Sequence, residues 1–90
     1  MRYRVEYTER AARLRDFLPA DDRRRLLRLV RKVAEDPYGP GTGLRYTNDE
    51  LTRASREDSA MVEFIVIPSR RVVYVLEADI YDAPRGYNVI

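Results

Sequence analysis

The sequence predicts a single α+β domain in which a strand and two helices come first and three or four antiparallel strands follow. Three observations carry this prediction: a period-two pattern at the start, two capped helical stretches after it, and two apolar runs joined by a turn near the end. With 90 residues the chain can build one modest core, so we expect residues 1–90 to form one domain. The two helices should pack as a hairpin on one face of the sheet.

The first strand and the first helix follow each other directly. Residues 2–8 alternate between polar and apolar side chains, as in a half-buried strand. Thr8 can cap the free amide groups of a helix that begins at Glu9, where an acidic side chain favours the positive end of the helix dipole. Pro19 disfavours the helical conformation at Leu18, so the predicted helix spans Glu9–Phe17.

The second helix should be longer and amphipathic. Asp21 and Asp22 open it, and from Leu26 onward the apolar residues recur at steps of three and four. The loop at residues 36–43 ends it, because three glycines and two prolines in eight residues are turn chemistry.

The later strands differ in the strength of their signals. Residues 44–46 and 51–56 give weak strand patterns, whereas 61–67 and 72–76 are apolar runs separated by a turn at 68–71 and form a predicted hairpin. Residues 87–90 could pair as an edge strand or fray. The strand at residues 2–8 must find its partner within this later sheet.

The composition excludes several kinds of chemistry. The chain has no cysteine and no histidine, which removes disulfides, thiol nucleophiles, Ser-His pairs and His-ligated zinc. We expect no metal and no cofactor. No run approaches the length of a membrane span and the first residues are charged, so we expect a cytoplasmic protein that does not bind membranes.

The charge is unevenly distributed along the chain. Sixteen of the 17 basic residues are arginine, a side chain suited to bidentate contact with phosphate or carboxylate groups. Residues 1–45 hold 12 basic and 7 acidic side chains, whereas residues 46–90 hold 5 and 8. The helical half is therefore basic and the half with the later strands is acidic. Genomic composition bias would explain the arginine content equally well.

Residues 3–41, which read YRVEYTERAARLRDFLPADDRRRLLRLVRKVAEDPYGPG, resemble the amino-terminal half of toxins of the RelE/ParE superfamily. The shared constellation is a strand, a short helix ended by leucine and proline, a long Arg-rich helix and a glycine-rich loop. The resemblance implies a RelE/ParE-like fold and a type II toxin–antitoxin system, in which an antitoxin protein holds the toxin. RelE-type members cut messenger RNA on the ribosome without histidine, and ParE-type members act on DNA gyrase.

The resemblance also implies site residues. Tyr87, with Arg85 before it, matches the terminal tyrosine of the family and is the candidate catalytic pair. Met61 stands where the family carries an arginine, and Glu77 and Asp79 stand in a segment that is basic in the family. These acidic groups would repel RNA and the charge that develops on phosphorus during cleavage.

Four arginines are candidates for binding the phosphates of RNA on the sheet. They belong to the predicted strand at 51–56 and to the hairpin turn: Arg53, Arg56, Arg70 and Arg71. A solvated turn and charge-protected strand edges are the more ordinary explanation of these arginines.

Three functions therefore stay open on the sequence: a ribosome-dependent endoribonuclease, a ParE-like toxin that binds a protein target such as gyrase, and a silent homologue that binds only an antitoxin-like partner or itself as a homodimer.

Overall fold

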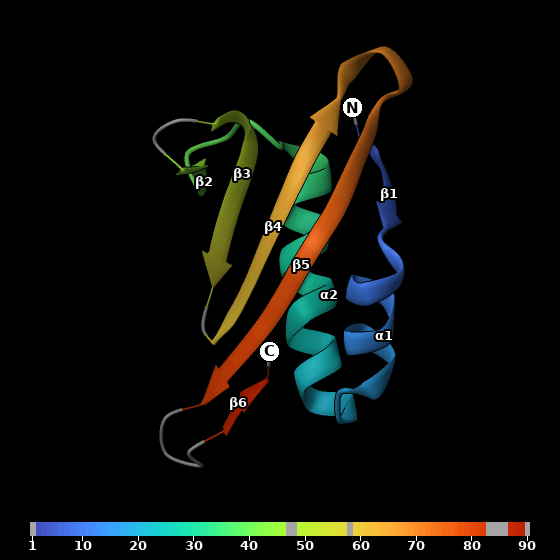
Figure 1. Cartoon of the computed structure of the whole chain (residues 1–90), viewed down its shortest axis with the longest axis vertical. Coiled ribbons are helices and arrows are strands. Elements are labelled where there is room, and N and C mark those ends of the chain that lie inside the picture. The colour runs from blue at the N-terminus through green and yellow to red at the C-terminus, as the bar shows by residue number, and fades with distance from the viewer. Residues whose placement is uncertain (1, 47–48, 58, 83–86, 90) are drawn as a thin grey trace.

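Two helices cover one face of a mixed sheet (Figure 1). The computed structural model describes residues 2–46, 49–57, 59–82 and 87–89. Within these ranges the sheet has six strands, in the order β1-β5-β4-β3-β2 with β6 paired to β5. Their bounds are β1 Arg4–Tyr7, β2 Thr42–Tyr46, β3 Asp49–Glu57, β4 Ala60–Ile67, β5 Val72–Asp82 and β6 Tyr87–Val89. The predicted α+β class and the helical hairpin on one sheet face are confirmed.

The two helices begin and end close to the predicted residues. Helix α1 spans Glu9–Phe17, and the Ala11 amide donates a hydrogen bond of 3.1 Å to the Thr8 hydroxyl that caps it. Helix α2 spans Ala20–Glu35 and directs its apolar stripe into the core. Leu18, between the helices, is extended and almost fully buried, so the short connection also seals the end of the core.

The first strand finds its partner in the last long strand, and the pairing is parallel. The register runs from Arg4 opposite Val72 to Tyr7 opposite Val75. The Arg4 amide also donates a hydrogen bond of 2.8 Å to the Arg71 carbonyl at the hairpin tip. The expectation of a purely antiparallel sheet was therefore wrong for this one pair, whereas all other described strand pairs are antiparallel.

Strand β5 continues well beyond Leu76, where the sequence pattern predicted its end. Phe64 lies opposite Val75 and Glu63 opposite Glu77, so Leu76 is an extra residue on β5, a β-bulge. The bulge shifts the alternation, and Ala78 then points into the core as Val75 did. Because the period-two pattern breaks at this point, the second half of β5 did not read as a strand.

The core lies between α2 and the sheet. Its larger buried side chains come from both layers and include Leu18, Leu26, Val33, Val62, Phe64, Val75 and Ile80. On β4 the buried residues alternate as Ala60, Val62 and Phe64, which leaves Met61 and Glu63 on the opposite face. That face, which no described helix covers, is called the open face below (Figure 1).

No helix within the described ranges is long and apolar enough to cross a membrane.

Candidate functional site

The open face carries an unusual row of charges across its central strands. The strand register places Arg56, Met61 and Asp79 side by side, and Glu63 directly opposite Glu77 in the adjacent row. Like charges directly opposite each other on neighbouring strands destabilise a sheet. This arrangement therefore needs compensating cations.

Two arginines from outside these strands supply that compensation. Arg45 Nε on β2 lies 2.9 Å from Glu63 Oε2, and Arg10 Nε on α1 lies 3.2 Å from Glu77 Oε1. The Glu63 side chain is only 13% exposed, and its carboxylate also accepts a hydrogen bond of 3.4 Å from the Tyr46 hydroxyl. The Arg45 guanidinium lies 4.9 Å from the centre of the Tyr46 ring. Each glutamate thus has its own cationic partner.

Asp79 has no such partner among the described residues. Its Oδ1 atom is buried and accepts no hydrogen bond from them. Burial raises the pKa of Asp79, the Ile80 amide that donates to the carboxyl lowers it, and the negative charge of Glu77 raises it further. The net direction is upward, so this carboxylate is poorly stabilised in its ionised form.

These side chains line a depression of about 250 Å³. Its charged lining consists of two arginines and three carboxyl groups, Arg10, Arg45, Glu63, Glu77 and Asp79. Transition-state stabilisation in RNA cleavage requires cations directed at the phosphate, whereas here both guanidinium groups already bind glutamates. Among the described residues no acidic cluster is arranged to hold a metal ion. The depression is suited to a positively charged ligand.

The structure separates the two arginines of β3 that the sequence grouped together. Arg53 points to the helix side, where its Nε donates to the Pro37 carbonyl at 3.1 Å and its Nη2 donates to Thr42 Oγ1 at 2.7 Å. Its guanidinium also lies 5.2 Å from the centre of the Tyr38 ring. Arg53 therefore holds the loop after α2, while Arg56 is exposed on the open face.

Arg70 and Arg71 lie at the tip of the β4–β5 hairpin, apart from Arg56. Arg56 pairs with Met61, and the tip begins after Ile67, six residues or about 20 Å further along the strand. Arg71 adopts the left-handed conformation with φ 54°, and its guanidinium lies 5.9 Å from the Tyr3 ring centre. The four arginines do not form one group, and their role in binding RNA stays a prediction.

The candidate catalytic pair can be placed only in part. The backbone of Tyr87 pairs with Asp82 at the carboxyl end of β5, the end at which Asp79 lies. Arg85 lies outside the described residues, and the catalytic roles of both residues stay predictions.

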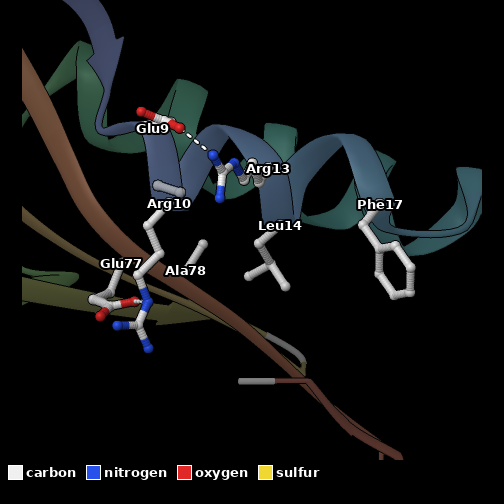
Figure 2. Close-up of a pocket in the computed structure, with 8 residues that line it drawn as sticks. Glu9, Arg10, Arg13, Leu14, Phe17, Glu77 and Ala78 are labelled. Atoms are coloured by element: carbon white, nitrogen blue, oxygen red, sulfur yellow. Dashed lines mark hydrogen bonds and ion pairs between the residues drawn. The ribbon is translucent and has the colours of Figure 1, made fainter.

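A second feature, which the sequence reading did not single out, is a groove between α1 and β5 (Figure 2). It has a volume of about 650 Å³, and Leu14 and Phe17 of α1 face Ala78 of β5 across it. Phe17 is 79% exposed, the highest value among the large exposed apolar side chains described. In the sequence, the signal for this groove was the three-residue spacing of Leu14 and Phe17, which places both apolar side chains on one face of the helix.

The rim of the groove carries both signs of charge. Arg13 pairs with Glu9 along α1, and Arg10 pairs with Glu77 across to β5, as Figure 2 shows. The Arg10–Glu77 ion pair also separates this groove from the depression on the open face, because it lines both.

Comparisons with known proteins identify the fold. Neither a family model nor a curated protein sequence matches the chain. Solved structures do match. The RelBE2 toxin–antitoxin complex from Mycobacterium tuberculosis superposes with a TM-score of 0.79 at 16% identity, over 90% of this chain and 93% of that one.

Two further structures agree. The isolated Escherichia coli RelE toxin gives a TM-score of 0.72 at 22% identity, over 89% of this chain and 85% of that one. The archaeal RelE–RelB complex from Pyrococcus horikoshii gives a TM-score of 0.67 at 22% identity, over 87% of this chain and 93% of that one. The chain is thus a two-helix, mixed-sheet α+β domain, and its particular fold is that of the RelE toxins, as the resemblance in residues 3–41 implied.

Proposed function

We propose that this chain is the toxin-like component of a toxin–antitoxin pair, and that its groove between α1 and β5 binds the antitoxin. The observation that carries the proposal is the apolar floor of the groove, where Phe17 is 79% exposed beside the half-buried Leu14 and the buried Ala78. A contiguous apolar surface with a polar rim is typical of a protein-binding site. Two of the matching structures are complexes of a RelE-type protein with its antitoxin.

The groove favours an amphipathic segment as its occupant. One apolar stripe of a helix would cover Leu14 and Phe17, and charged residues beside that stripe would meet Arg13 and Glu77 on the rim. Burying the phenyl ring of Phe17 would contribute about 1.5–3 kcal/mol to binding. We expect this pair to form in the cytoplasm.

The test is co-expression with the product of a small neighbouring open reading frame, followed by purification through a tag on that product. Phe17→Glu should lose co-purification, because it places a charge in the apolar floor. Leu51→Glu is the matched control, since Leu51 is 72% exposed but lies on β3, outside the groove. Equal retention of both variants would contradict the assignment of the groove.

Ribosome-dependent RNA cleavage receives less support than partner binding. Cleavage through the 2′-hydroxyl requires a base and free cations near the phosphate. Around the depression the open face instead presents Asp79 without a cationic partner among the described residues and two arginines already bound to glutamates, which leaves Arg56 as a single cation on this face outside the ion pairs that the described residues form.

This alternative can be tested by inducing the protein in a bacterial host while following growth and mapping new 5′ ends in messenger RNA. Cuts confined to translating ribosomes, lost in Tyr87→Phe, would establish the nuclease. Growth arrest without cuts would favour a protein target such as gyrase, and the absence of arrest would favour a homologue that only binds its partner.

A further inference from the structure

The open face has two chemically different halves along β4. Toward the hairpin tip it presents Ile65 and Ile67, with Tyr74 of β5 directly opposite Ile65. All three side chains are partly exposed, and no described helix covers them. This half is an apolar strip on a sheet face without a partner.

The other half carries three carboxyl groups, and one of them has no ion-pair partner among the described residues even though the exposed Arg56 lies in the same row, beyond Met61. Glu63 and Glu77 each bind one arginine at 2.9 and 3.2 Å, which leaves the Asp79 carboxylate as the third negative group with no cation from the described residues. The buried Asp79 Oδ1 atom lies at a depression large enough to admit a side chain, at about 250 Å³. An acceptor that is removed from water and has no donor costs free energy until a donor reaches it.

We propose that the open face binds a basic, partly apolar segment of a partner protein, whose arginine or lysine donates to Asp79 while its apolar side chains cover Ile65 and Tyr74. Charge complementarity at Asp79 selects this occupant over RNA, because the two glutamates already bind arginines while a phosphate group at the depression would meet the one carboxylate that has no cationic partner among the described residues. The proposal goes beyond the groove between α1 and β5, since it concerns another face of the sheet and a different chemistry.

The register sets the geometry of such a segment. Asp79 lies opposite Met61, which is four residues from Ile65 along β4, or about 13 Å. An extended segment that matches this distance carries its basic and apolar side chains four residues apart. Arginine is favoured over lysine where the donor must be directed at a carboxylate, because its planar fork fits that group.

The probe is a capped synthetic peptide with two leucines, two arginines and threonines alternating between them, so that leucine and arginine stand four residues apart. A second peptide replaces both arginines with glutamate. Binding to the full chain is followed by amide chemical-shift changes in NMR, which also report the face that is contacted. We expect the arginine peptide to shift amides of β4 and β5 and the glutamate peptide to shift none.

The variants test the named acceptor. Asp79→Asn should weaken binding of the arginine peptide about tenfold or more, because the amide oxygen of asparagine can still accept a hydrogen bond but no longer carries the negative charge that strengthens it. Glu35→Gln removes an exposed carboxylate on α2 and should leave the affinity unchanged. Equal binding by the wild type and Asp79→Asn, or an equal loss in Glu35→Gln, would overturn the proposal.

Three other results would also overturn it. One is the absence of measurable binding, and another is an oligoribonucleotide that shifts the same amides of β4 and β5. The third is tighter binding of the peptide by Arg85→Gln, which would show that a cation of this chain already serves Asp79. None of these results depends on the groove or on the antitoxin, so the two proposals can fail independently.

Discussion

Removing the guanidinium of Arg23 should destabilise the fold far more than removing a neighbouring arginine. Arg23, near the start of α2, reaches back to the end of α1, where the last carbonyl groups of a helix have no partner within it. Its Nε donates to the Arg15 carbonyl at 3.0 Å, and its Nη2 donates to the carbonyls of Asp16 at 2.9 Å and Leu18 at 2.8 Å. One side chain thus terminates α1 and joins the two helices.

The magnitude follows from these three bonds. Each contributes about 1 kcal/mol net, because a bond from a charged donor is strong but this side chain is only half-buried. Arg23→Ala should therefore lower the free energy of unfolding by about 3 kcal/mol. For a domain of this size the midpoint of thermal unfolding would fall by about 12–24 °C.

The assay is urea unfolding followed by far-ultraviolet circular dichroism. Arg24→Ala is the matched control, since Arg24 is exposed and its one ion pair with a described residue is that with Asp21 at 3.2 Å, and it should cost less than about 1 kcal/mol. Arg23→Lys should recover only part of the loss, because an ammonium group cannot reproduce the fork. A loss below about 0.5 kcal/mol in Arg23→Ala, or equal losses in Arg23→Ala and Arg24→Ala, would refute the reasoning.

Three further predictions concern other parts of the molecule. Burial raises the pKa of Asp79 above its ordinary value of 3.8, so the contribution of this group to the free energy of unfolding should fall as the pH rises through the interval above 3.8. Relative to the wild type, Asp79→Asn should therefore gain stability over that interval; urea unfolding of both proteins from pH 3 to 7 checks this, and parallel curves would contradict it. Phe64→Ala should lower the free energy of unfolding by about 3–5 kcal/mol, because Phe64 is fully buried at the centre of the core. A decrease of only about 1 kcal/mol would show that the surrounding core collapses into the cavity. Arg53→Ala should lower the free energy of unfolding by about 1–2 kcal/mol, because the loop at Pro37 and Thr42 loses two hydrogen bonds. Weaker RNA binding without this loss of stability would instead support Arg53 as a phosphate ligand.

The local parts of the fold could be predicted because their causes lie close together in the sequence. The hydroxyl of Thr8 and the proline at position 19 bound α1 at the predicted residues, and the apolar period of α2 identified its buried stripe. The burial of Asp22 could not be predicted in this way. It depends on how α2 approaches the sheet, and the carboxylate ends 3.7 Å from Arg25 Nη1.

The rest depends on pairings between distant residues. The parallel partner of β1 is a choice among several strands, and the bulge at Leu76 is visible only once β4 and β5 are in register. The face on which a strand arginine lies changes with a shift of one residue, which is why Arg53 and Arg56 were grouped although they point to opposite faces.

Of the candidate site, only the unusual charge pattern could be predicted, and the catalytic and RNA-binding roles assigned from the sequence stay predictions. The acidic character of residues 63–79 and the replacement of an arginine by Met61 were evident from the sequence. The ion pairs that neutralise Glu63 and Glu77 were not, because Arg45 and Arg10 come from different parts of the chain. The groove at Phe17 also needs β5 beside α1 to exist.

The hydroxyl group of Thr8 makes two hydrogen bonds whose consequence concerns motion. It accepts from the Ala11 amide at 3.1 Å and donates to the carbonyl of the bulge residue Leu76 at 3.0 Å. The first turn of α1 therefore cannot unfold without disturbing the hydrogen bond that ties Thr8 to β5. Amide hydrogen exchange at Ala11 should then require the opening of a unit that includes β5. The first turn of α1, which lines the groove, should therefore stay folded on the timescale on which ordinary helix ends unfold.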